Sequence, residues 1–274
     1  MFEFATDFVK DVESSLEKEL SAETVEVFGI EAKDILQDGY TYATKDGGKR
    51  IRPICVYLGA MATGKDLTAK YNGLVKLGTI VELIHSYSLV HDDLPAMDND
   101  DFRRGKLSTH KKYGEANGIL IGDGLLTKAM EISLSVPNDS LFTLSAHKLS
   151  KGAMNMVTGQ ALDLQEGCKD YMPIYALKTA QLISASFEAG ATYMGAEEEV
   201  VEMVKECGHH LGMAFQIADD ILDGANNSWV KEVGEEKARE ILECETDKAK
   251  KCAETLSGSD QLKGFAEKLL KRKK

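Results

Sequence analysis

Apolar side chains recur mostly at intervals of three and four residues along this 274-residue chain. Such spacing gathers apolar side chains on one face of an α-helix, whereas sustained apolar-polar alternation, typical of half-buried strands, is hard to find. The pattern predicts helices over residues 3–37, 52–64, 68–94, 115–134, 140–166, 173–193, 197–223 and 232–254.

Helix-breaking residues are few and short. Only four prolines occur, and the breaks between apolar runs are short glycine- or asparagine-containing stretches, none of which reads as a flexible linker between domains. We therefore predict an all-α protein in which a single domain over residues 1–274 forms a helical bundle.

Composition narrows the class of protein. A formal net charge of -12 argues against a nucleic-acid partner, because phosphate binding depends on clustered Lys and Arg. Five cysteines without a CxxC pair fit reduced thiols and a cytoplasmic location better than a disulfide framework. No secretory signal and no 18-residue uncharged apolar stretch is present, so no membrane span is expected.

Two apolar runs end in Asp-Asp: VELIHSYSLVHDD (81–93) and GMAFQIADDILD (212–223). In the second run, Asp219 and Asp223 are four residues apart, about 40° around a helix, so both point from one face. Asp92 and Asp98 are six apart and would diverge by about 240° on a continuous helix. Because Pro95 disfavours a helical conformation at Leu94, we expect the helix to end there and Asp98 to return towards Asp92.

Both acidic clusters offer hard oxygen ligands without His or Cys, which suits Mg²⁺ better than zinc. Mg²⁺ takes one or two protein carboxylates and completes its shell with water and substrate phosphate. Helix capping or simple solvation is the alternative, and it explains one acidic cluster more easily than two. The pair of clusters favours a metal-bridged polyphosphate site.

Basic residues supply the second half of this hypothesis. Arg103 and Arg104 follow the first acidic cluster, and GGKRIRP (47–53) places Lys49, Arg50 and Arg52 after two glycines. Arginine binds phosphate through two parallel hydrogen bonds, and glycines let backbone amides approach an anion. On their own these residues would be read as surface charges; beside two acidic clusters they indicate a second diphosphate held without metal.

Three further positions are candidates for the same chemistry. His85 lies seven residues before Asp92 on nearly the same helical face, although a lone histidine on an apolar helix is often a core residue. Lys178 lies in an otherwise apolar run, where a buried ammonium group requires an anionic partner. Gln216 lies three residues before Asp219.

With these residues assembled, the chain resembles the trans-isoprenyl diphosphate synthases, also called the polyprenyl synthetase family, over most of its length. The motifs GGKRIRP, HDDLPAMDNDDFRRG, GQALDL, KTAQLISASFEAGA and FQIADDILD occur in the family's order. The spacing from Asp92 to Asp98, with Pro95 inside it and Arg-Arg-Gly after it, is similar to the bacterial farnesyl diphosphate synthase type.

The resemblance implies an all-α fold around a deep central cavity, a homodimer, and three Mg²⁺ ions bound with substrate. It implies that an allylic diphosphate condenses with isopentenyl diphosphate: diphosphate leaves, the allylic cation is attacked by the C=C bond of isopentenyl diphosphate, and a proton is lost. Its implied Mg²⁺ ligands are Asp92, Asp93, Asp98, Asp219, Asp220 and Asp223; its allylic diphosphate ligands are Arg103, Lys178 and Gln216; Thr179 and Gln216 steady the cation; and isopentenyl diphosphate is held by Lys49, Arg52, His85 and Arg104.

Chain length in the resembling family is limited by bulk beneath the allylic site. Tyr87 is the fifth residue before Asp92, about 7.5 Å along a helix, and Ser88 is one turn before it. We hypothesise that Tyr87 forms a floor that limits the product to C15, and ordinary helix packing is the alternative. C10 and C20 products remain open.

The chain departs from the family after Asp223. DDILDGANNSWVKEVG passes almost directly to the next helix, as though roughly fifteen to twenty residues were absent by comparison with the family pattern. Either the loop is short in this protein or the sequence lacks a segment. The basic end KRKK (271–274) is read as a solvated tail.

Two other functions compete with this one. A non-catalytic subunit of a heteromeric prenyl synthase would explain the short loop, but such a subunit is expected to lose an acidic cluster. A phosphohydrolase of the His-Asp type would use His91 and Asp92, but it requires further His ligands and leaves the second cluster unexplained.

Overall fold

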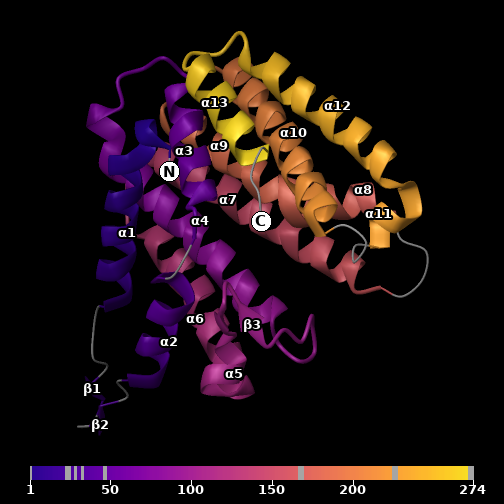
Figure 1. Ribbon diagram of the computed structural model, residues 1–274. Coiled ribbons are helices and arrows are strands. Elements are labelled where there is room, and N and C mark those ends of the chain that lie inside the picture. The colour runs from indigo at the N-terminus through magenta and orange to yellow at the C-terminus, as the bar shows by residue number, and fades with distance from the viewer. Residues whose placement is uncertain are drawn as a thin grey trace. The chain divides into compact units, whose positions relative to one another are not determined.

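The computed structural model describes residues 2–21, 26–27, 30–31, 34–45, 48–165, 170–223 and 228–270. Within these residues the regular secondary structure is helical apart from two very short hairpins (Figure 1), which confirms the all-α prediction. The chain packs as two compact units. The first holds residues 3–54 and 75–139, and the second holds residue 2, residues 55–74 and residues 140–274.

The first unit differs from its prediction at the N-terminal end. The helix expected over residues 3–37 is wrong as a single element, because α1 ends at Ser21 and a small antiparallel hairpin precedes α2. β-Branched Val27 and Ile30 pair in that hairpin, and such residues favour extended backbone. Its elements are the 3-10 turn Glu3–Ala5, α1 (Thr6–Ser21), β1 (Glu26–Val27), β2 (Ile30–Glu31), α2 (Asp34–Lys45), β3 (Phe102–Arg103), β4 (Lys106–Leu107), α5 (Thr109–Tyr113) and α6 (Glu115–Leu134), with parts of α3 (Ile51–Met61) and α4 (Tyr71–Asp92).

Helix α4 provides much of the core of the first unit. Leu77, Ile80 and Leu83 are fully buried. At Gly78 a Cβ atom would lie 3.0 Å from Val12 and 3.3 Å from Phe8 of α1, so the absence of a side chain lets α1 pack closely. The contact fixes the helix whose C-terminal end carries the first acidic cluster.

One helical stretch in the described part of the chain is long and apolar enough to cross a membrane by length and composition alone. It covers Thr68–Asp92, and 72% of its apolar window is buried inside the structure. Such burial is that of a core helix of a folded domain.

The second unit contains most of the remaining helices. Its centre is α9, in which every residue from Leu182 to Tyr193 is buried. Two glycines allow α3 and α9 to cross closely there: a side chain at Gly59 of α3 would collide with the carbonyl of Phe187, and one at Gly190 of α9 with that of Val56. Besides parts of α3 and α4, its elements are the 3-10 turn Thr68–Lys70, α7 (Ser140–Asp163), α8 (Tyr171–Tyr175), the π-helical turn η3 (Ala176–Ala180), α9 (Gln181–Tyr193), α10 (Glu198–Asp223), α11 (Ser228–Val233), α12 (Glu235–Ala253) and α13 (Ser259–Leu270).

Three features of the second unit go beyond the prediction. The helix expected over residues 232–254 is two helices, α11 and α12, because Gly234 adopts φ of 84° between them. Helix α13 was missed, although Leu262, Phe265 and Leu269 follow helical spacing and are buried. Only residues 224–227 separate α10 from α11, and they and the basic end 271–274 lie outside the described residues.

Candidate active site

The first acidic cluster lies where α4 ends. The helix stops at Asp92, and the backbone N–H of Asp98 then donates to the backbone carbonyl of Asp92 at 2.8 Å. The chain has turned back by one loop, as Pro95 led us to expect, so that prediction is confirmed. The Asp92 side chain is half-buried and that of Asp98 is exposed, so both can face a solvated ion.

Asp93 is bound differently from its neighbour. It is 2% exposed, and its Oδ1 accepts a hydrogen bond from Nε of Arg103 at 2.9 Å and a second from Nη2 of the same guanidinium. The pKa of Asp93 is raised, because burial outweighs the hydrogen bonds from Arg103 that lower it. Arg103 also reaches Asp100, with Nη2 to Oδ2 at 3.4 Å, so the guanidinium is held between two carboxylates.

A two-residue hairpin presents both arginines. Strands β3 and β4 pair antiparallel, and Arg104 and Gly105 form the turn with φ of 53° and 77°. Positive φ at both central residues is the conformation of the tightest β-hairpin turns, and glycine at the second position favours it. The hairpin was missed from sequence because its two strands contain only two residues each.

A buried carboxylate holds the basic residues together. Glu82 of α4 accepts from Nη1 of Arg50 at 2.7 Å, and both side chains are 3% exposed. Nη2 of Arg50 donates to the carbonyl of Thr44 at 2.8 Å. A Cβ atom at Gly48 would lie 3.2 Å from Nη1 of Arg104 and 3.2 Å from Glu82, so the glycine permits this approach.

Sequence reasoning did not single out Glu82, and it grouped Arg50 with the residues that indicate a second diphosphate. The available signal was a carboxylate inside an otherwise apolar helix, which requires a cationic partner when buried. Lys49 is exposed and Arg52 is half-buried in the same part of the unit.

His85 lies among these arginines. Burial lowers the pKa of His85 well below 6.5, and the positive charges of Arg52, Arg104, Arg103 and Arg50 lower it further. The ring is therefore neutral at physiological pH, and its Nδ1 is buried without a hydrogen-bond partner among the described residues. Glu82 and Glu13 pair with Arg50, and Asp93 pairs with Arg103. Four arginines near one neutral ring form a concentration of guanidinium groups that is suited to an anion.

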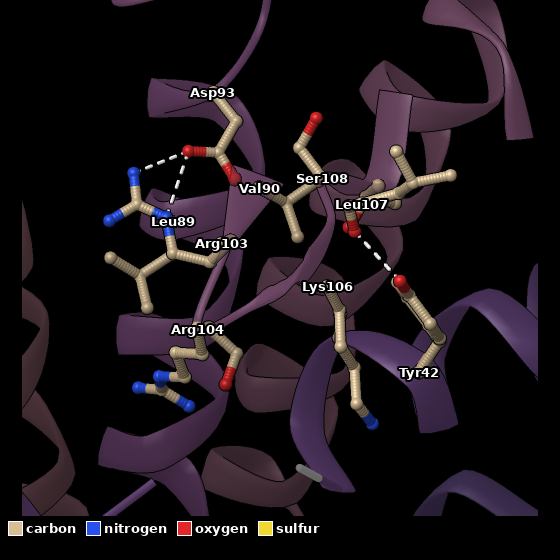
Figure 2. A pocket seen from close by; sticks show the side chains of 12 residues that line it. Tyr42, Leu89, Val90, Asp93, Arg103, Arg104, Lys106, Leu107 and Ser108 are labelled. Carbon is tan, nitrogen blue, oxygen red and sulfur yellow. Dashed lines mark hydrogen bonds and ion pairs between the residues drawn. The ribbon is translucent and has the colours of Figure 1, made fainter. Parts of the chain in front are cut away.

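Figure 2 shows a small pocket between α4, the β3–β4 hairpin and α2. Asp93 and Arg103 lie at one side of it and Lys106 at another, and the hydroxyl of Tyr42 donates to the carbonyl of Leu107 at 2.7 Å. This bond fixes the hairpin to α2, which helps to hold Arg104 in place.

The two chain-length residues occupy the helical turns before Asp92. Tyr87 is 6% exposed, and its ring meets that of His91 edge-on at 5.8 Å. Ser88 donates its hydroxyl to the carbonyl of His85 at 2.9 Å. His91 pairs through Nε2 with the carbonyl of Ile119 at 3.0 Å, so it packs on α6 instead of accompanying Asp92.

In the second unit a polar network surrounds the π-helical turn η3. Nζ of Lys178 donates to Oδ2 of Asp163 on α7 at 2.7 Å, which is the anionic partner that a lysine in an apolar run requires. The hydroxyl of Thr179 donates to Oε1 of Gln216 at 2.7 Å, and Nε2 of Gln216 donates to Oδ1 of Asp220 at 2.9 Å. Asp163 and the network's connection to Asp220 were not foreseen from sequence.

The second acidic cluster repeats the pattern of the first. Asp220 is 4% exposed and accepts from Gln216 and from the hydroxyl of Tyr175, whereas Asp219 is half-buried. Asp223 is the last residue of α10. Among the described residues, no three His, Cys, Asp or Glu side chains lie close enough to form a metal site by themselves.

Comparison with known proteins assigns these motifs to a family. The family model described as polyprenyl synthetase matches residues 33–239. The farnesyl diphosphate synthase of Bacillus subtilis is 37% identical over 242 residues, covering 84% of this chain and 79% of that protein. The geranylgeranyl diphosphate synthase of Methanosarcina mazei is 36% identical over 205 residues, covering 72% of this chain and 61% of that protein. A geranyltransferase from Legionella pneumophila has a similar crystal structure, with a TM-score of 0.85, 31% identity, and coverage of 98% of this chain and 95% of that one.

Proposed function

Because the chain belongs to the polyprenyl synthetase family, we propose that its acidic and basic clusters bind the two diphosphates of a prenyl transfer reaction. The protein is a short-chain trans-prenyltransferase that condenses an allylic diphosphate with isopentenyl diphosphate. The allylic substrate is dimethylallyl or geranyl diphosphate, and the proposed main product is farnesyl diphosphate.

Asp92 and Asp98 hold metal in the first unit, with Asp93 acting behind them. Farnesyl diphosphate synthases in general use Mg²⁺, and the donors present here fit it because they are carboxylate oxygens without His or Cys. Asp219, Asp220 and Asp223 form the second cluster, and three ions with substrate bound is the proposed number. Bound Mg²⁺ would supply positive charge to the diphosphate as it leaves.

Isopentenyl diphosphate is held without metal by Lys49, Arg52, His85 and Arg104. The observation that supports this is the group of four arginines whose positive charges act on the buried ring of His85. Neutral His85 can donate or accept one hydrogen bond there without adding charge. Such preorganised charge binds an anion without reorganisation.

The allylic diphosphate is held by Arg103, Lys178 and Gln216. The pairing of Arg103 with Asp93 and of Lys178 with Asp163 fixes the two cationic side chains before substrate binds. As diphosphate leaves, the carbonyl and hydroxyl dipoles of Gln216 and Thr179 stabilise the allylic cation. The C=C bond of isopentenyl diphosphate then attacks the cation, and a proton is lost to the departed diphosphate, in an apolar cavity that excludes water.

Product length is proposed to be set by Tyr87, with Ser88 beside it. Support comes from the burial of Tyr87 five residues, about one and a half helical turns, before Asp92 and from its edge-on contact with His91, which holds a bulky ring in place. The alternatives are C10 and C20 products. The likeness to a geranylgeranyl diphosphate synthase keeps the C20 product open.

At the level of the whole chain, we propose a single catalytic domain over residues 1–274, a cytoplasmic location and a homodimer without a nucleic-acid partner. The dimer is supported by exposed apolar side chains on α6, including Leu134 at 79% and Met130 at 56% exposure. A non-catalytic subunit is the second candidate, favoured by the four-residue connection between α10 and α11.

Replacing single carboxylates tests the metal assignment. Asp92→Asn and Asp219→Asn should each lower kcat by about a hundredfold or more, because each removes charge that stabilises the leaving group. Asp101→Asn is the matched control, since Asp101 is exposed and pairs with Lys111 at 2.8 Å. Wild-type rates in Asp92→Asn and Asp219→Asn, measured at saturating Mg²⁺ in a condensation assay, would contradict the assignment.

A further inference from the structure

The carboxylate of Asp220 is occupied by protein donors. Nε2 of Gln216 donates to Oδ1 at 2.9 Å, and the hydroxyl of Tyr175 donates to Oδ2. Asp220 is 4% exposed, whereas Asp219 beside it is half-buried. Consecutive residues point about 100° apart on a helix, so the two carboxylates of this pair face different surroundings.

Tyr175 is fixed as a donor. A carboxylate has only acceptor atoms, so the hydroxyl of Tyr175 must be the donor in its contact with Oδ2 of Asp220. A charge-assisted hydrogen bond from a buried hydroxyl is among the stronger polar contacts in proteins. Since Gln216 bonds the other oxygen, Asp220 cannot turn without breaking one of the two bonds.

The ring of Tyr175 is itself supported by α11. The indole of Trp229 meets it edge-on, with centroids 5.5 Å apart and planes at 83°. Trp229 is 3% exposed and belongs to a buried apolar cluster with Met213, Ile217 and Ala180. Trp229 is the second residue of α11, the helix that follows the four-residue connection where the family pattern has a longer loop.

The hydrogen bonds of this network all run towards Asp220. Asp220 accepts from Nε2 of Gln216, which leaves Oε1 of Gln216 as the acceptor for Thr179. A carboxylate has only acceptor atoms, so it determines which end of the amide faces it. Asp220 therefore sets the orientation of Gln216, and through it that of Thr179, next to Lys178.

We infer that Tyr175, braced by Trp229, is a positioning residue that holds Asp220 as an internal anchor, and that Asp220 orients Gln216 and Thr179 instead of binding metal directly. This inference rests on the proposed role of the second acidic cluster. It assigns metal binding in α10 to Asp219 and Asp223. It also gives α11 a part in the site, because Trp229 of α11 supports Tyr175.

Tyr175→Phe tests this, because it removes the donor and keeps the ring. We expect kcat to fall about tenfold, the value for one hydrogen bond to a charged group, and the Mg²⁺ concentration for half-maximal rate to rise by less than about twofold. Tyr171→Phe is the matched control, because it removes a hydroxyl from a neighbouring ring whose centroid lies 6.0 Å from that of Tyr175. It should keep the wild-type rate.

A double-mutant cycle with Asp220→Asn isolates the pathway. If Tyr175 acts through Asp220, Tyr175→Phe should lower kcat by less than about twofold in a protein that already carries Asp220→Asn. An equal loss in both backgrounds would overturn the inference, and so would a Tyr175→Phe enzyme with wild-type kcat. A large rise in the Mg²⁺ requirement of Asp220→Asn, as large as that of Asp219→Asn, would show that Asp220 binds metal and would also overturn it.

Trp229→Phe is the second variant should Tyr175→Phe not fold, as judged by thermal unfolding. It keeps an apolar ring behind Tyr175 and should lower kcat in the same direction by a smaller factor. A wild-type kcat in Trp229→Phe would contradict the supporting role of Trp229 behind Tyr175. Failure of the proposed function is distinguishable, because it would appear as no condensation by the wild-type protein.

Discussion

At the scale of single residues, Asp93 and Asp220 occupy the same place in their Asp-Asp pairs. Each is buried and accepts two hydrogen bonds within its own unit, Asp93 from Arg103 and Asp220 from Gln216 and Tyr175. Burying an ionised carboxylate is costly unless it is paired. The pairing makes the second aspartate of each motif an anchor, whereas the first is half-buried and is the one that we propose faces the ion.

His85 predicts a pH dependence of stability. The folded-state pKa lies well below 6.5 because of burial and four arginines, whereas the unfolded chain binds a proton below about pH 6.5. The unfolded state therefore holds more protons in acid, and stability falls by up to about 1.4 kcal/mol for each pH unit below that value while His85 stays neutral. His85→Gln should remove this loss, measured by urea unfolding at pH 7.5 and 5.5.

His147→Gln is the control for this measurement, because His147 is exposed on α7. It should lose stability in acid as the wild type does. An identical acid dependence in His85→Gln and the wild type would contradict the neutral, buried state of His85.

Tyr87 predicts the product length. Replacing it with Ala removes a ring that is 6% exposed, which opens room for further isoprene units. Tyr87→Ala should shift the products from C15 to C20 or longer, as measured by chromatography of the dephosphorylated alcohols. An unchanged C15 product would reduce Tyr87 to ordinary packing.

The sequence predicts the structural role of some site residues and not of others. Helical spacing and Pro95 were enough to foresee that Asp98 returns to Asp92, because both depend on local backbone geometry. Glu82, Asp163 and Tyr175 were not foreseen, since each acquires its role from a residue more than ten positions away in sequence. A buried charge in an apolar run showed that a partner exists without saying which one.

At the scale of elements, the β3–β4 hairpin determines where two arginines point. Arg103 lies in a strand and pairs with Asp93, while Arg104 lies in the turn and faces Glu82. A hairpin with a two-residue turn is thus enough to orient two adjacent arginines towards different partners. Strands this short give no period-two signal in a sequence, and the same limit explains the missed hairpin between α1 and α2.

Gly105→Ala tests the hairpin. No atom lies within 4 Å of the added Cβ, so the cost is only that of φ at 77°, about 1 kcal/mol. The strained turn should displace Arg104 and raise KM for isopentenyl diphosphate several-fold with little change in the Mg²⁺ requirement. Gly264→Ala is the control, because it also meets no atom within 4 Å but lies in the helix α13. Equal KM values in the two variants would contradict this role.

At the scale of the whole molecule, the proposed homodimer predicts an effect of charge on α6. Met130 and Leu134 are exposed apolar side chains one helical turn apart, which a second copy would cover. Met130→Glu with Leu134→Glu should convert the dimer to a monomer in sedimentation velocity, because burying unpaired carboxylates is costly. Lys263→Glu on α13 should stay dimeric. A dimer that survives the α6 changes would place the interface elsewhere.

The family and the all-α fold followed from ordered motifs and helical spacing, whereas the consequence of the short connection after Asp223 did not. The sequence alone left activity in doubt there. In the second unit, Trp229 follows that connection and packs on Tyr175, which binds Asp220. An intact second acidic network argues for a catalytic protein over a non-catalytic subunit.

Incubating the purified wild-type protein with Mg²⁺, isopentenyl diphosphate and geranyl diphosphate tests this account most directly. We predict Mg²⁺-dependent release of diphosphate and formation of farnesyl diphosphate, with no product when the metal is chelated. Intact substrates after prolonged incubation would indicate a non-catalytic subunit, and release of phosphate without condensation would indicate a hydrolase; either result would contradict the account.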